Sequence, residues 1–249
     1  MINDRLRELI DGLDIQTDLW WLATVLCGLA SAMMGAFAFP ESGVFWAYLS
    51  VLLRISFAAC LSQQPWGTVF ARLLPLGLAV GVFAVFPDYL LAQGFKTAQR
   101  IYPHPEAKVL ASPFFVPLMW ACAVVELGYV VLRIGSLALK RWPGQTGQGL
   151  TMLAGGFVAA MSAACTDVLA VKARWWSYGE GRAVIESALA PHVAVAHFLA
   201  FMGFLPLFSR YVACPGSRTY ATVRYGVIFA GILFGSLLLS YALIEAVRS

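Results

Sequence analysis

Charged side chains are scarce in this chain. Only 12% of its 249 residues are charged, whereas 60% are hydrophobic and the mean hydropathy is +0.76. A soluble domain of this length cannot remove so much apolar surface from water, so the composition is that of a polytopic membrane protein. The formal net charge of +4 is spread over several loops and forms no basic tract. Nucleic acid is therefore not an expected partner.

Histidine and paired cysteine are also in short supply. The chain has three histidines and five scattered cysteines, with no Cys-x-x-Cys pair, which predicts neither a disulfide framework nor a zinc site. Membrane desaturases need about eight histidines for two irons, which excludes that class. His192 and His197 are five residues apart and would point to different faces of a helix. We expect no metal, no haem and no other cofactor.

Two further enzyme classes lack their signature residues. The last apolar run, VRYGVIFAGILFGSLLLSYALIEAV, contains no lysine. A retinal pigment needs a Schiff-base lysine in its last span and is therefore not expected. No serine occupies a Gly-x-Ser-x-Gly elbow, so a serine hydrolase is not supported either.

Long apolar runs dominate what is present. Seven of them reach the length of a membrane-spanning helix: 19–39, 44–63, 70–92, 113–139, 150–171, 193–213 and 222–247. They predict an all-α, polytopic integral membrane protein with about seven transmembrane helices, forming a single domain over residues 19–249. Residues 1–18 are acidic and amphipathic, unlike a cleavable signal peptide, and predict a short surface helix.

The distribution of Lys and Arg sets the expected orientation. We call the membrane side that bears the N-terminus side A and the opposite side B. Nine Lys and Arg fall on side A and seven on side B. This small excess favours a cytoplasmic N-terminus, and we expect the chain to reside in the cytoplasmic membrane of a bacterium.

Three ionisable residues fall well inside the predicted spans: Arg54, Glu126 and Asp167. Each costs roughly 2.5–3.5 kcal/mol on insertion scales, which makes it a candidate functional residue. With a rise of about 1.5 Å per residue, Arg54 lies about 15 Å from side B, Glu126 about 19 Å and Asp167 about 6 Å. Arg54 and Glu126 are therefore close enough in depth for an ion pair.

Other chemistry-bearing side chains lie near the depth of Asp167. They are Trp46, Tyr48, Trp120, His197, Tyr241 and Glu245. A desolvated, protonated carboxylic acid can donate a proton to an alkene, and aromatic faces can stabilise the resulting carbocation. We therefore predict Asp167 as the general acid, with His197 and Glu126 as further catalytic groups. The expected substrate-binding residues are Trp46, Tyr48, Arg54, Trp120, Trp175, Trp176, Tyr178 and Tyr241.

Structural interpretations of these residues stay open. Arg54 and Glu126 form a purely structural ion pair in one reading. In another, Glu126 pairs locally with Tyr129 and Arg133, which share its helix face. Trp175, Trp176 and Tyr178 fit an interfacial aromatic belt. His197, considered on its own, also fits a structural role as a hydrogen-bonded residue that packs between helices.

Three segments resemble a known family. The run DVLAVKARWWSY at 167–178 is followed by LAPHVAVAHF at 189–198, and SPFFVPLMW occupies 112–120. An aspartate ending one helix, an aromatic W-x-[WYF] segment and a proline-led opening of the next helix resemble carotenoid-processing membrane proteins. These are the bacterial carotenoid hydratases and the small multi-span lycopene cyclases. The resemblance covers roughly residues 102–200. It implies acid-initiated chemistry on an apolar isoprenoid double bond, without a redox cofactor.

One departure from the cyclase pattern narrows this expectation. The cyclase motif carries a glutamate two residues after its proline, whereas this chain has Val193 at that position after Pro191. The resemblance therefore favours the hydratase-like group or a divergent member with another terpenoid substrate. The alternative function is a non-catalytic membrane subunit or scaffold of a larger assembly. A small transporter is a third reading, weakened by the absence of an internal repeat. Association with itself or with another chain stays open.

Overall fold

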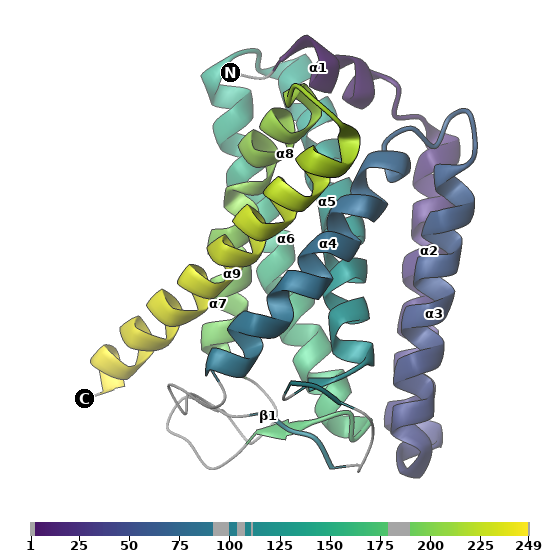
Figure 1. Cartoon of the computed structure of the whole chain (residues 1–249), viewed down its shortest axis with the longest axis vertical. Helices are drawn as coiled ribbons and strands as arrows, with labels where there is room; N and C mark the ends of the chain where they lie inside the picture. Colours follow the sequence, from purple (N-terminus) through teal and green to yellow (C-terminus); the bar gives the residue numbers. More distant parts are fainter. Residues whose placement is uncertain (1–2, 92–99, 104–107, 111, 179–189, 249) are drawn as a thin grey trace.

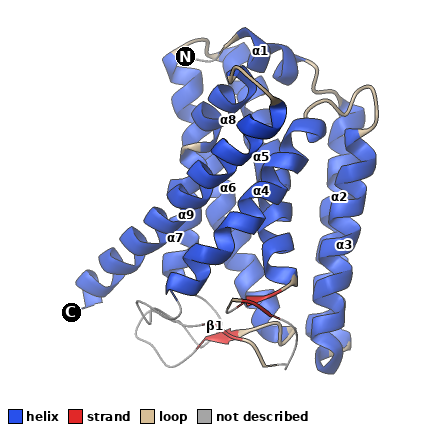
Figure 2. Cartoon of the chain, in the orientation of Figure 1, coloured by secondary structure: helices blue, strands red, loops and turns tan. Residues whose placement is uncertain are grey.

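The computed structural model describes residues 3–91, 100–103, 108–110, 112–178 and 190–248. Its helices are α1 Asp4–Asp11, α2 Ile15–Met33, α3 Gly43–Ser62, α4 Phe70–Tyr89, α5 Phe115–Arg141, α6 Gln145–Lys172, α7 Pro191–Met202, α8 Phe204–Ala213 and α9 Arg218–Arg248. A π-helical turn, Met34–Ala38, and a 3-10 turn, Pro40–Ser42, join α2 to α3. The strands are β1 Arg100–Ile101, β2 Lys108–Val109, β3 Ser112–Pro113 and β4 Ser177–Tyr178. Figure 2 shows how completely helices dominate this arrangement.

The fold is that of an all-α polytopic membrane protein, as the hydropathy pattern predicts. Six of the described helices are long and apolar enough to cross a membrane, and a bent pair makes a seventh span if it is counted as one. The first helix of this set begins at Ile15, four residues earlier than the predicted 19. The Asp14 carboxylate accepts a hydrogen bond from the Thr17 backbone N–H at 2.8 Å, which caps the helix at this point.

The sixth predicted span is broken into α7 and α8, which meet at an angle of 43°. Pro206 lies in the first turn of α8. Proline has no backbone N–H to donate to the Met202 carbonyl, and its ring clashes with that carbonyl in a continuous helix. The helical ladder therefore ends at Gly203 and restarts with the bond from the Leu207 N–H to the Gly203 carbonyl, at 3.2 Å. The apolar pattern alone does not reveal this break.

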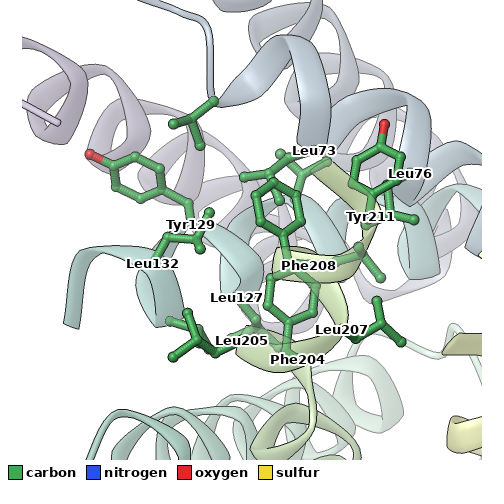
Figure 3. Packing of buried hydrophobic residues seen from close by; sticks show 14 of the residues in the cluster. Leu73, Leu76, Leu127, Tyr129, Leu132, Phe204, Leu205, Leu207, Phe208 and Tyr211 are labelled. Carbon is green, nitrogen blue, oxygen red and sulfur yellow. The ribbon is translucent and has the colours of Figure 1, made fainter. Parts of the chain in front are cut away.

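The hydrophobic core is centred on α8 and on the side-A halves of α4, α5 and α9. Phe204 and Phe208 are fully buried and stack at 5.6 Å between ring centroids. Figure 3 shows them among leucines contributed by α4 and α5, such as Leu73 and Leu127. α1 lies across this end of the bundle (Figure 1) and buries Leu6 and Ile10, so the expected amphipathic surface helix packs on the spans.

Two short β-ladders close the side-B end, where the sequence predicts only a loop. β1 pairs antiparallel with β4, placing Arg100 opposite Tyr178, and β2 pairs with β3. Lys96 and His104, in the segment that joins the predicted spans 70–92 and 113–139, lie outside the described residues. Two-residue strands show no alternating pattern, so no sequence signal predicts them. The β1–β4 pairing brings Arg100 and Tyr178 to the end of α6.

Two glycines one turn apart let α4 approach the backbone of α5. A Cβ atom built on Gly77 would lie 2.7 Å from the Ala121 carbonyl oxygen, and one on Gly81 would lie 2.2 Å from that of Pro117. This spacing of small residues is the usual device for close helix packing in membranes.

We predict that Gly81→Ala destabilises the chain by about 1–3 kcal/mol, because the added methyl forces α4 away from α5. Thermal unfolding in neutral detergent measures the effect. Gly231→Ala is the matched control, since nothing lies within 4 Å of a Cβ atom at that position in α9. Equal midpoints of thermal unfolding for Gly81→Ala and Gly231→Ala would contradict the close approach of α4 to α5.

Candidate active site in the side-B half

Arg54 of α3 and Glu126 of α5 form an ion pair inside the spans. Arg54 Nε and Nη2 each donate a hydrogen bond of 2.5 Å, to Oε1 and Oε2 of Glu126 respectively. This two-pronged geometry is the strongest available to these side chains. Gly28 of α2 leaves the space that the Arg54 side chain occupies, because a Cβ there would lie 2.5 Å from Arg54 Cδ. The pairing predicted from depth is confirmed.

The alternative of local pairing along α5 is wrong. Tyr129 and Arg133 share the helix face of Glu126, but both bind Asp18 of α2. The Tyr129 hydroxyl donates to Asp18 Oδ1 at 2.6 Å, and Arg133 Nη2 donates to Oδ2 at 2.6 Å. Tyr129 and Arg133 bind a partner on another helix because α2 places the Asp18 carboxylate between their two donor groups.

Asp167 lies near the end of α6, 3% exposed, and faces Arg100 of β1. Arg100 Nη2 is 3.9 Å from Asp167 Oδ1, and Nη1 is 3.8 Å from Asp88 Oδ1 at the end of α4. The guanidinium carbon also lies 4.8 Å from the ring centroid of Trp176. One cation is thus shared between two carboxylates and an aromatic face, and neither carboxylate holds it closely.

Tyr178 of β4 extends this cluster. Its hydroxyl lies 3.5 Å from Arg100 Nε, a contact set by the β1–β4 register. Burial raises the pKa of Tyr178 above its ordinary value, and the nearby Asp167 carboxylate raises it further. The phenol therefore keeps its proton at neutral pH and is available as a hydrogen-bond donor.

A cavity of about 80 Å³ joins the two ion pairs. It lies between α3, α5, α6 and α7, with Arg54 and Glu126 at its mid-membrane end and Arg100 and Asp167 toward side B. Six of the eleven expected catalytic and substrate-binding residues line it: Arg54, Trp120, Glu126, Asp167, Trp176 and His197. The rest of the lining is mostly apolar, so the cavity has charged residues at its two ends and a hydrophobic wall between them.

His197 lines this cavity, and the hydrogen bond of its ring indicates which nitrogen carries the proton. Its ring stacks on Trp120 at 5.3 Å with an angle of 9°, and its Nδ1 lies 2.8 Å from the Val193 carbonyl oxygen. A carbonyl only accepts, so Nδ1 carries the proton and Nε2 of the neutral ring keeps its lone pair. The packing role and the catalytic role are thus compatible in this residue.

Two polar atoms at the cavity have no partner among the described residues. Asp167 Oδ2 and Trp176 Nε1 are buried and make no hydrogen bond there. Unpaired buried polar atoms cost about 1–3 kcal/mol each and are rare unless a ligand or water binds them. One is an acceptor when ionised and the other a donor, so a hydroxyl-bearing molecule satisfies both.

The other expected substrate-binding residues do not line the cavity. Trp46 stacks on Phe39 in the α2–α3 turn, Tyr48 and Trp175 pack edge-on against Phe115, and Tyr241 lies edge-on to His192. Tyr178 reaches the site only through Arg100 and Asp167. Trp175 and Trp176 are each 3% exposed, so they pack inside the protein and do not form a lipid-facing belt.

Two residues of this cluster, Arg100 and Asp88, were not predicted from the sequence. Arg100 falls in the long polar loop and Asp88 at the end of an apolar run, where charges are ordinary. The one available signal is that Asp88 follows Pro87 inside the predicted third span. Within the described residues, no group of three His, Cys, Asp or Glu is arranged to hold a metal ion.

We predict that Arg54→Met or Glu126→Met alone destabilises the chain by about 3–5 kcal/mol, because each leaves a buried charge unpaired. The double variant is expected to recover most of this loss, since it removes both charges. Thermal unfolding in detergent across the four proteins measures the coupling. Additive losses in the double variant would show that the pair does not act as a unit.

Comparison with known proteins gives one match. A family model described as a domain of unknown function (DUF6989) matches residues 85–244, whereas no curated protein and no solved structure matches the chain. The matched segment contains Glu126, Asp167 and His197, and it begins after α3, which carries Arg54. Because the match spans well over half of the sequence, the chain belongs to the family described as domain of unknown function DUF6989.

Proposed function

We propose that the chain is a membrane-embedded enzyme that protonates a carbon–carbon double bond of an isoprenoid, with Asp167 as the acid. The observation that carries this proposal is the cavity itself. It brings a buried carboxyl oxygen without a partner to a wall of apolar and aromatic side chains within the spans. The resemblance of 112–120, 167–178 and 189–198 to carotenoid hydratases and lycopene cyclases supports the same reaction class.

The proposed reaction begins with transfer of the Asp167 proton to the alkene, which leaves a tertiary carbocation. Trp120 and Trp176 line the cavity and offer π-faces that stabilise a cation. His197 Nε2 then either takes a proton from the substrate, giving an isomer or ring, or takes one from a water molecule that adds to the cation. In both cases the proton that His197 gains returns to Asp167 before the next turnover, so the cycle balances and no electrons are exchanged.

Arg100 tunes the acid in this proposal. A close, two-pronged arginine would hold Asp167 as a carboxylate, as Arg54 does for Glu126. Arg100 instead stands 3.9 Å away and is shared with Asp88. Tyr178 keeps its own proton and lies beside Arg100, so in this proposal its hydroxyl is available to donate a hydrogen bond to Asp167. Glu126 is fully engaged with Arg54, so we assign it to orienting the mid-membrane end of the site.

The size of the cavity restricts how a substrate binds. A volume of about 80 Å³ is smaller than a cavity of about 150 Å³ that admits benzene, so a prenyl end has to widen the cavity in order to bind, and no more than one such end would be inside. The remainder of the chain would lie in the bilayer, which is the solvent for such molecules. We place the protein in the cytoplasmic membrane of a bacterium, with its N-terminus in the cytoplasm and without a bound cofactor.

A non-catalytic role in a larger assembly is the second candidate. The observation in its favour is the Arg54–Glu126 pair, whose 2.5 Å hydrogen bonds leave neither group free for chemistry. In that case Asp167 and Arg100 would be a second structural pair that holds β1 to α6.

We predict that a bacterium making lycopene and shorter isoprenoids gains a new compound when it expresses this chain, and that Asp167→Asn abolishes it. Liquid chromatography with mass spectrometry measures the compound, as a hydrate heavier by one water or as an isomer of unchanged mass. His197→Gln is expected to lower its yield by about 10²-fold or more, as for loss of an acid–base group.

Asp4→Asn is the matched control for this experiment. It makes the same carboxylate-to-amide change at an exposed position of α1, and Asp4 does not line the cavity. The enzyme proposal expects the control to keep the product while Asp167→Asn loses it. If all variants yield the same amount of folded protein and none changes the isoprenoid profile of the cells, the enzyme proposal is contradicted and the structural role is favoured.

A further inference from the structure

A second pocket, unrelated to the candidate active site, lies at the opposite end of the bundle. It has a volume of about 440 Å³ and is lined by residues of α1, of the end of α5, of the turn that follows α5 and of the start of α6. Because α5 ends at Arg141 and α6 begins at Gln145, this turn marks the side-A surface of the membrane. Phospholipid headgroups occupy that level of a bilayer.

The pocket carries more positive than negative charge. Arg7 of α1 and Lys140 of α5 line it, together with one carboxylate, Asp11. None of these three forms an ion pair among the described residues. The lining therefore has a net charge of about +1, which matches the single negative charge of a phosphodiester.

Ser136 adds an unused hydrogen-bonding group to this pocket. A serine in a helix usually donates to the carbonyl one turn back, as Ser31 does to Cys27. Ser136 lines the pocket, is 1% exposed, and its Oγ has no partner in the described part of the chain. A buried hydroxyl of this kind indicates a partner that comes from outside the protein.

The start of α6 reinforces the preference for an anion. α6 is 28 residues long, and its N-cap residue, Gly144, lines the pocket and offers no side chain to cap the first-turn N–H groups. Uncapped N–H groups and the helix dipole attract negative charge. Gly144 has φ of 83°, a conformation that disfavours the Ser, Thr or Asp side chains that cap other helices.

From these observations we propose that the α1–α5–α6 pocket binds the phosphodiester headgroup of an anionic phospholipid. Arg7 and Lys140 contact the phosphate from two sides, and Ser136 and the start of α6 donate hydrogen bonds to its oxygens. Asp11 accepts a hydrogen bond from a headgroup hydroxyl. A bound lipid would thereby fasten α1 to the spans on side A. Soluble phosphate has the same oxygen chemistry and is the alternative source.

The test measures lipid binding to the full-length chain in neutral detergent by native mass spectrometry. Phosphatidylglycerol, phosphatidylcholine and inorganic phosphate serve as the probes. We expect phosphatidylglycerol to bind more tightly than phosphatidylcholine, and Arg7→Ala and Lys140→Ala each to weaken it by about five-fold. Ser136→Ala is expected to weaken it without any change in charge.

Arg141→Ala is the matched control, because Arg141 is exposed on the same membrane face next to Lys140 but does not line the pocket. It is expected to leave phosphatidylglycerol binding unchanged. If Arg141→Ala weakens phosphatidylglycerol binding as much as Lys140→Ala does, the binding reflects general attraction to a positive surface, and the proposed site is overturned. Displacement of the lipid by inorganic phosphate at equal concentration would overturn the lipid as its ligand. Circular dichroism confirms that each variant is folded.

Discussion

Hydrocarbon offers a charged side chain no water, so every ionised group inside the spans depends on a partner from the protein. Arg54 and Glu126 meet this requirement with two hydrogen bonds between α3 and α5. Asp18 meets it with Tyr129 and Arg133, which joins α2 to α5 nearer side A. The α2–α3 hairpin lies along one flank of the bundle in Figure 1. Only 28% of the apolar stretch of each of its two spans is buried inside the protein, against 72% for α5. These two polar contacts therefore fix its position where apolar packing is limited.

The same requirement is met only loosely at Asp167, and this contrast defines the candidate site. Arg100 lies 3.9 Å from Asp167 Oδ1, while Oδ2 has no partner among the described residues. A purely structural pair gains nothing from this looseness, since an incompletely satisfied buried carboxylate is costly. A proton donor gains from it, because a carboxyl group must change its protonation state during each turnover. The aromatic stack of Trp120 on His197 lines the same cavity, and in the proposed reaction it supplies a base and a π-face.

The sequence predicts depth well and rotation poorly. Depth counting pairs Arg54 with Glu126 and groups Asp167, His197 and Trp120 in one layer, because the helical rise is constant. It also places Tyr48 and Tyr241 in that layer, although both turn away from the cavity. Arg100 could not be predicted, since it reaches the site through a two-residue strand pairing with no sequence period. Trp175 and Trp176 fit an interfacial belt by composition, yet tertiary packing against Phe115 and Arg100 buries them.

The proposed reaction transfers a proton from Asp167 to a carbon atom of the substrate, and deuterium labelling follows this transfer. The purified chain would be incubated with a lycopene-type isoprenoid in heavy water, and the product analysed by mass spectrometry. In heavy water the acidic position of Asp167 carries deuterium, so we expect one non-exchangeable deuterium on carbon per reacted double bond. The Asp167→Asn protein is expected to give none. Product that forms without deuterium on carbon, or in equal amount with Asp167→Asn, would contradict acid catalysis by this residue.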